Sequence, residues 1–124
     1  MEKDVVINGA TLHFKSTGAT PIIYRNRYKR DMMVDMQKLA KEFEANKKNK
    51  EADEGSNIPV HMLETFERVA HIMHCQGDPE QPKDIVEWAD QFEVFNIYEI
   101  LPDILDLWQS NNQQLSTAKK KAER

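Results

Sequence analysis

Three side chains that commonly bind metals lie close together in the middle of the chain. His71, His74 and Cys75 are spaced i, i+3 and i+4, so a helix would place them on one face. A structural zinc site needs four ligands, and the nearest further histidine, His61, lies almost three helical turns upstream. We therefore expect no metal site, with Cys75 a small core residue and the two histidines at a packing or solvent boundary.

The segment YRNRYKR, residues 24–30, combines two tyrosines with four cations, a composition typical of surfaces that stack bases and neutralise phosphates. An amphipathic helix also explains it, because Tyr24 and Tyr28 begin an apolar stripe at helical spacing, continued by Met32, Met36, Leu39 and Phe43. A helix-turn-helix motif needs a short connection, and the twelve-residue polar segment 46–57 after this helix is long for one. We interpret the tyrosines as core residues and the cations as their solvated flanks, with nucleic-acid binding as the alternative.

The carboxylates give no sign of catalysis. Glu93, Glu99, Asp103 and Asp106 are expected on the solvent side of apolar helices, outside the desolvated settings that acid–base catalysis needs. The chain has no GxSxG, GxGxxG or phosphate-binding glycine loop. The sequence therefore predicts a protein without enzymatic activity and without a cofactor.

Length and composition are those of a soluble single domain. The chain has 124 residues, of which 40% are hydrophobic and 31% charged. Its one cysteine cannot form an internal disulfide, and the first residues lack the apolar run of a signal peptide. No apolar run approaches the ~20 residues of a membrane span. We expect a cytoplasmic protein that enters no membrane.

Charge is distributed unevenly along the chain. Residues 22–50 carry nine cations and four anions, a net charge of +5, whereas residues 78–106 carry nine anions and one cation, a net charge of −8. The two halves either neutralise each other inside one subunit or attract each other between copies. For the second case we predict a homo-oligomer in which the basic first helix meets the acidic last helix, through Arg25, Arg27, Lys29, Arg30, Asp103 and Asp106.

Hydrophobic periodicity and turn residues predict a small, mainly α domain of the α+β class, with about four helices and an N-terminal β-hairpin. Asn8-Gly9 is a hairpin turn signal, and Thr20-Pro21 is a helix start with Thr20 as the N-cap. One globular domain over 1–112 is expected, followed by a flexible basic tail over 113–124. Its parts are a hairpin (3–16), a first helix (20–45), a mobile loop (46–57) and a helical part (59–112) with helices after Pro59, over 83–93 and after Asn96.

The last predicted helix has the strongest periodic signal. Ile97, Ile100, Leu101, Ile104, Leu105 and Trp108 recur at helical spacing, and Leu107 widens the apolar surface. Pro102 predicts a bend near Leu101 or two short helices that meet at the proline. A helix this apolar is either central to the core or shared with a partner. We predict a partner-binding face formed by Ile100, Leu101, Ile104, Leu107 and Trp108.

The succession of these features resembles the tail assembly chaperones of long-tailed bacteriophages and of prophages of Gram-positive bacteria. The resemblance covers most of the chain. It rests on Phe14-Lys15-Ser16-Thr17, Pro21-Ile22, Tyr24-Arg25, Tyr28, Asp31, Trp88-Ala89-Asp90, Phe92, the stretch IYEILPDILDLW over 97–108, Asn111-Asn112 and the Ser-Thr-x-Lys-Lys-Lys end. The chain departs from the family at Lys29, where relatives carry glycine, so we expect the first helix to continue through that position.

The resemblance implies a non-enzymatic role in viral tail assembly. Such chaperones shield the apolar, helical tape measure protein and help the tail tube protein to assemble around it. They act in the cytoplasm of the bacterial host and leave before the virion is mature. Short and frameshift-extended forms occur in the family, and Lys119-Lys120-Lys121 is compatible with a slippery coding stretch. The alternative function is that of a small nucleic-acid-binding regulator of phage or plasmid origin.

Overall fold

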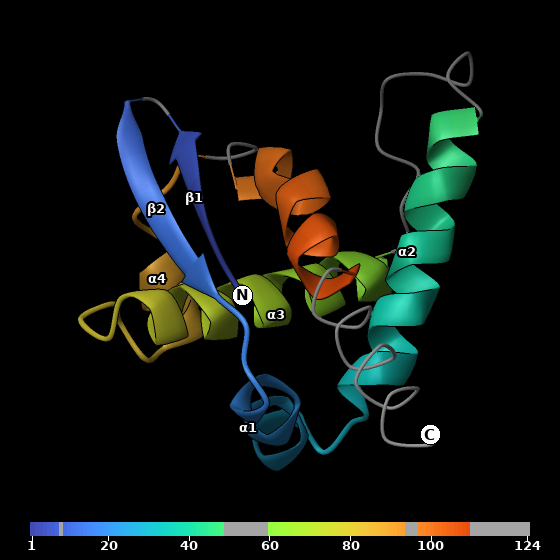
Figure 1. Ribbon diagram of the computed structural model, residues 1–124, viewed down its shortest axis with the longest axis horizontal. Helices are drawn as coiled ribbons and strands as arrows, with labels where there is room; N and C mark the ends of the chain where they lie inside the picture. The colour runs from blue at the N-terminus through green and yellow to red at the C-terminus, as the bar shows by residue number, and fades with distance from the viewer. Residues whose placement is uncertain (8, 49–59, 94–96, 110–124) are drawn as a thin grey trace, which may run out of the picture.

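The computed structural model describes residues 1–7, 9–48, 60–93 and 97–109 and confirms a small α+β domain with an N-terminal hairpin (Figure 1). The helices α3 and α2 and the helical residues 101–109 surround a shared apolar core, and the hairpin closes one side of it. The elements in chain order are β1 (Glu2–Ile7), β2 (Ala10–Lys15), α1 (Ala19–Tyr28), α2 (Met32–Lys48), α3 (Val60–Gly77), α4 (Ile85–Ala89), the 3₁₀-helix η2 (Ile97–Ile100) and an α-helical segment over 101–109.

The hairpin follows the predicted pattern closely. β1 and β2 pair antiparallel from Glu2 opposite Lys15 to Ile7 opposite Ala10, and Gly9 takes the positive φ of 83° that the turn requires. Side chains alternate between the two faces, so Leu12 and Phe14 enter the core. A two-stranded sheet is marginal by itself, and this one is stabilised by packing on α3.

Helix α3 lies at the centre of the fold and contacts β2, α1, α2 and α4. Its last residue, Gly77, lies directly against the backbone of His13 in β2, where a Cβ atom would overlap the His13 carbonyl oxygen. One turn earlier, the His74 ring packs at a tilt of 36° against Phe14, with centroids 5.0 Å apart. The hairpin can therefore approach α3 this closely only because residue 77 has no side chain.

The prediction of one helix over 20–45 is wrong, because the chain turns after Tyr28. Lys29 adopts the left-handed conformation (φ 58°, ψ 38°) and its N–H bonds the Arg25 carbonyl at 2.8 Å, which ends α1. α2 then begins at Met32, and the Asp31 carboxylate accepts the Met33 N–H at 2.9 Å as an N-cap. Lys29 therefore takes the helix-ending conformation that usually belongs to glycine, and we call the turn over 29–31 the elbow.

Other predicted boundaries move by a few residues. α1 starts at Ala19 with Gly18 at the cap, so Thr20 lies in the first turn, where its hydroxyl accepts the Thr17 N–H at 2.9 Å. The helix predicted over 83–93 covers only Ile85–Ala89, with Asp84 as its N-cap. Residues 46–48 belong to α2, and the rest of the predicted loop, Asn96 and the predicted tail lie outside the described residues.

The prediction that two short helices meet at Pro102 is confirmed. η2 passes directly into the α-helical residues 101–109, so the proline occupies the first turn of the second segment. A missing N–H costs nothing at that position, because the first N–H groups of a helix have no partner within it. Two short helices therefore meet beside the proline without a loss of hydrogen bonding.

Candidate functional site

The predicted partner-binding face lies in the core of the molecule. Figure 1 places the segment 101–109 between the hairpin and α2. The five residues predicted to contact a partner are each only 1% to 5% exposed, namely Ile100, Leu101, Ile104, Leu107 and Trp108. The prediction that these residues form a partner-binding face is therefore wrong, and the alternative that the helix is central to the core is confirmed. Periodicity identified the buried side of the helix but not what buries it.

The acidic side of the same segment is bound within the molecule. Lys3 Nζ lies 3.2 Å from Asp103 Oδ1 and 3.0 Å from Asp106 Oδ2, which links the first strand to the last helix. The hydrogen bond to Asp106 raises the pKa of Lys3. We call this contact the clamp. Asp103 and Asp106 are thus paired with a cation of their own subunit but keep exposed side chains, 34% and 66%, and their predicted contact with the basic helix of another copy stays a prediction.

Beside the clamp, α2 and the last helix enclose a groove of about 350 Å³. Its apolar lining, which we call the floor, consists of the half-buried Ala40 and Phe43 from α2 and of Pro102 and the almost fully buried Leu105 from the last helix. The other lining residues, which we call the rim, are polar or charged. The complete lining is Lys3, Ala40, Phe43, Glu44, Pro102, Asp103, Leu105, Asp106 and Gln109. A groove between two helices with an apolar floor and a charged rim suits an amphipathic helix as its ligand.

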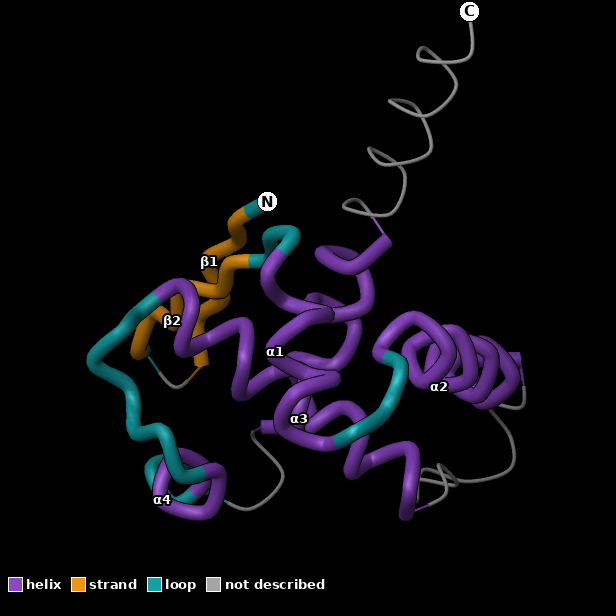
Figure 2. Tube along the Cα trace, turned by 90° about the horizontal axis from the view of Figure 1, so that it is seen from below, coloured by secondary structure: helices purple, strands orange, loops and turns teal. Residues whose placement is uncertain are grey.

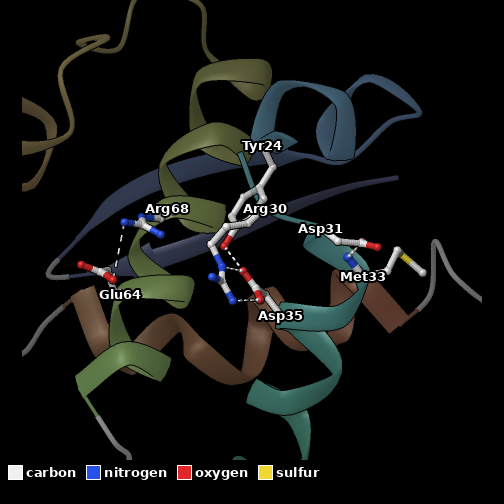
Figure 3. Close-up of polar contacts among 7 residues, drawn as sticks. All are labelled: Tyr24, Arg30, Asp31, Met33, Asp35, Glu64 and Arg68. Atoms are coloured by element: carbon white, nitrogen blue, oxygen red, sulfur yellow. Dashed lines mark hydrogen bonds and ion pairs between the residues drawn. The ribbon is translucent and has the colours of Figure 1, made fainter. Parts of the chain in front are cut away.

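A buried polar contact stabilises the elbow (Figure 3). The Arg30 guanidinium donates two hydrogen bonds to the Asp35 carboxylate, at 2.7 and 2.8 Å, and the Tyr24 hydroxyl donates a third at 2.7 Å. The Asp35 side chain is 4% exposed, and its bonds to Arg30 lower the pKa of Asp35 despite the burial. Burial and the same carboxylate raise the pKa of Tyr24 to about 12. Tyr24 is a core residue as predicted, and Arg30 is committed to its own subunit.

A second cavity, of about 550 Å³, opens beside the elbow. Arg68 from α3 lies over the Tyr28 ring at 4.5 Å from its centroid and within 3.5 Å of Glu64, which Figure 3 shows next to it. The cavity also receives the exposed cations Lys29 and Lys38. Arg68 therefore has an aromatic and a carboxylate neighbour from its own subunit, whereas Lys29 and Lys38 are exposed to solvent.

His71 and His74 on α3 form hydrogen bonds that attach the α4 region to the core. His74 Nδ1 accepts the Trp88 Nε1–H at 2.9 Å, and His71 Nε2 donates to the Pro82 carbonyl at 2.9 Å. Both contacts hold α4 and its preceding loop against α3. Burial lowers the pKa of His71 and lowers that of His74 to about 4, and burial raises the pKa of the Cys75 thiol. Within the described residues, no group of three or more His, Cys, Asp and Glu side chains is placed to hold a metal.

All four predicted basic contact residues are exposed, and one of them, Arg30, is at the same time paired within the subunit. Arg25, Arg27 and Lys29 are exposed on α1 and at its end, whereas Arg30 is bound to Asp35. Sequence reasoning missed Lys3, Asp35 and Phe43 as site residues. The signal for the elbow was present in Asp31, a typical N-cap residue directly before the apolar Met32. No comparable local signal marks Lys3, whose partners lie about a hundred residues away.

Among the described helices none combines the length and the apolar character that crossing a membrane demands. Comparison of the chain with protein-family models, with curated proteins and with solved structures finds no match.

Proposed function

We propose that this chain is a non-enzymatic tail assembly chaperone of a long-tailed bacteriophage or prophage, which shields the tape measure protein and assists tail tube assembly. The order of its motifs resembles that of the family, and this resemblance supports the tape measure protein as the partner. The observation that carries the proposal is the groove between α2 and the last helix, which offers the half-buried apolar residues Ala40 and Phe43 among charged and polar lining residues. This groove replaces the buried stripe as the binding site.

The geometry suits a chaperone that releases its client. A helix laid in the groove would contact only a narrow apolar floor, and small interfaces of this kind bind weakly. The clamp borders the groove, so a bound helix would also meet the charges of Lys3, Asp103 and Asp106. Weak apolar contact with a polar rim allows the client to be shielded and then transferred to the tail tube protein.

Co-expression with the tape measure protein of the same genome tests the proposal. Ala40→Trp fills the groove and Phe43→Lys places a charge on its floor, so each variant should lower the soluble tape measure protein at least tenfold relative to the unsubstituted chain. Val34→Lys is the matched control, because Val34 is an exposed apolar residue of the same helix, is 44% exposed and does not line the groove. Circular dichroism and thermal melting establish that each variant is folded.

Two results would contradict the proposal. If the unsubstituted chain leaves the tape measure protein as insoluble as an empty vector does, the chaperone function is wrong. If the chain solubilises it but folded Ala40→Trp does so equally well, the function stands and the groove is not the binding site.

A specific observation also favours the second candidate, a small nucleic-acid-binding regulator. The break at Lys29 joins α1 to α2 by the three-residue elbow, and a helix-turn-helix requires such a short connection. Exposed cations lie on α1, at the elbow and on α2, among them Arg25, Lys29 and Lys41. A gel shift with random duplex DNA at low salt tests this function. A regulator binds with an affinity that falls steeply as salt is raised, and absence of a shift at low salt excludes it.

A further inference from the structure

The outer face of α1 is basic and has an exposed apolar residue at its centre. Ile22, Arg25 and Asn26 are spaced i, i+3 and i+4, which places them on one side of α1, Lys29 follows directly at the end of the helix, and all four are exposed. Ile22 is 47% exposed. Residues 19–30 contain four cations and no carboxylate, and only Arg30 is paired with an acid among the described residues. We call Ile22, Arg25, Asn26 and Lys29 the basic surface.

The outer face of α4 is acidic, and it also has an exposed apolar residue. Residues 78–93 contain six carboxylates and one lysine, a net charge of −5. Trp88 turns into the core, so the other side of the helix faces solvent with Val86, which is 72% exposed. Glu87 is exposed next to it on α4, Asp90 is exposed at the end of the helix, and Glu93 is exposed beyond that end. The lysine of this region, Lys83, donates to the Pro79 and Gln81 carbonyls of its own loop. We call Val86, Glu87, Asp90 and Glu93 the acidic surface.

The two surfaces are complementary but do not meet within one molecule. Ile22 and Val86 would be covered if they did, and both are among the exposed large hydrophobic residues. Figures 1 and 2 agree in showing α4 apart from α1, reached through the loop that follows α3. The internal neutralisation of the basic and acidic halves is therefore incomplete in one copy. The clamp and the elbow use Asp103, Asp106 and Arg30, whereas the basic and acidic surfaces remain open.

We propose that the basic surface of one copy binds the acidic surface of a second copy. Arg25 and Lys29 would face Glu87, Asp90 and Glu93, and Ile22 would pack on Val86. The contact is heterologous, because each copy uses one surface as donor and the other as acceptor. Repetition therefore produces a ring if the rotation closes and an open array if it does not. Charge pairs that stay near solvent give orientation and fast association rather than high affinity, so the assembly should form reversibly and weaken as salt is raised.

Paired charge reversals provide a sharp test by sedimentation velocity. The first variant, Arg25→Glu with Lys29→Glu, makes both surfaces acidic. The second, Glu87→Lys with Asp90→Lys, makes both basic. Each alone should sediment as a monomer at low salt, where the unsubstituted chain forms oligomers. A mixture of the two should associate again in alternating order, and a chain with all four substitutions should assemble by itself. Lys38→Glu with Lys41→Glu, an equal charge change on exposed positions of α2, should leave assembly intact.

Several outcomes would overturn this inference. A monomeric unsubstituted chain at low salt and high concentration excludes self-association. Oligomers that persist in either reversed variant place the contact elsewhere. Failure of the mixed variants to associate, when each is folded by circular dichroism, shows that these two surfaces are not partners. None of these results depends on the tape measure protein, so the inference can fail while the proposed chaperone function stands, and the reverse also holds.

Discussion

The helical part and the hairpin use ionisable side chains in opposite settings. In the helical part the Asp35 carboxylate is almost fully buried under Tyr24 and Arg30, and His74 is buried against Trp88. On the hairpin, Lys3 reaches Asp103 and Asp106 at a partly exposed position. His13 bonds Glu2 at 2.7 Å and also bonds Asp4, on the exposed face of the sheet.

This difference distinguishes contacts whose loss should destabilise the fold strongly from contacts whose loss should change its stability little. A buried ion or hydrogen bond has no water to replace a lost partner, so its removal leaves an unsatisfied group in the core. An exposed pair exchanges its partner for water and counter-ions at little cost. The joints between helices should therefore be sensitive to single substitutions, and the contacts of the hairpin should be tolerant.

The largest effect is expected at the elbow. Asp35→Ala removes the acceptor of both Arg30 and Tyr24, and the Tyr24 hydroxyl then remains in the core without this bond. We expect the free energy of unfolding to fall by about 2–4 kcal/mol, measured by urea denaturation. Asp31→Ala, which removes only an exposed N-cap, is the matched control with an expected loss of about 1 kcal/mol. A loss at Asp35 no greater than at Asp31 would contradict the comparison.

Acidification should weaken the helical part through His74. Its folded pKa is lowered to about 4, below the value of about 6.5 of an unfolded histidine, so the unfolded chain binds the proton first. Stability is therefore lost as pH falls from about 6.5 towards 4, by up to about 3 kcal/mol. His71 acts in the same direction because its pKa is also lowered. Urea denaturation between pH 7.5 and 4.5 measures the slope.

The hairpin histidine should respond with the opposite sign. Its bonds to Asp4 and Glu2 raise the pKa of His13, so its contribution to the stability of the fold is present below about pH 6.5 and is lost as pH rises through the folded pKa.

Two variants separate the histidines. His74→Gln should flatten the dependence of stability on pH, because a glutamine side chain accepts from Trp88 without titrating. His13→Gln should leave the dependence as steep as before or make it steeper. An unchanged slope in His74→Gln would show that another group governs the response to acid.

A smaller, stabilising effect is expected at Lys29. The left-handed conformation there is unfavourable for a residue with a Cβ and easy for glycine. Lys29→Gly should raise the free energy of unfolding by up to about 1 kcal/mol. Arg25→Gly, inside α1 and equally exposed, should lower it by about 1 kcal/mol. A destabilised Lys29→Gly would mean that the lysine side chain itself supports the elbow.

The sequence predicted those features that depend on near neighbours. Periodicity correctly placed Tyr24, Met36 and Leu39 in the core, and the glycine of Asn8-Gly9 correctly marked the hairpin turn. The elbow was missed because the left-handed conformation of Lys29 is imposed by the packing of α1 and α2 around Asp35, and lysine has no preference for it. The burial of the last helix by its own subunit was missed for a related reason. An apolar stripe predicts burial, but only the tertiary fold decides whether a neighbour in the same chain or another protein covers it.

The smallest effect is expected at the clamp. Lys3→Ala removes the ion pairs with Asp103 and Asp106, which join residues at opposite ends of the described chain. The Lys3 side chain is 34% exposed, and pairs of this kind contribute less than about 1 kcal/mol. Urea denaturation of the single variants and of Lys3→Ala with Asp106→Asn yields their coupling energy, which should decrease further in high salt. A coupling as large as the loss at Asp35, or one unaffected by salt, would mean that the clamp behaves as a buried contact. The hairpin and the last helix would then be joined as firmly as the helices at the elbow.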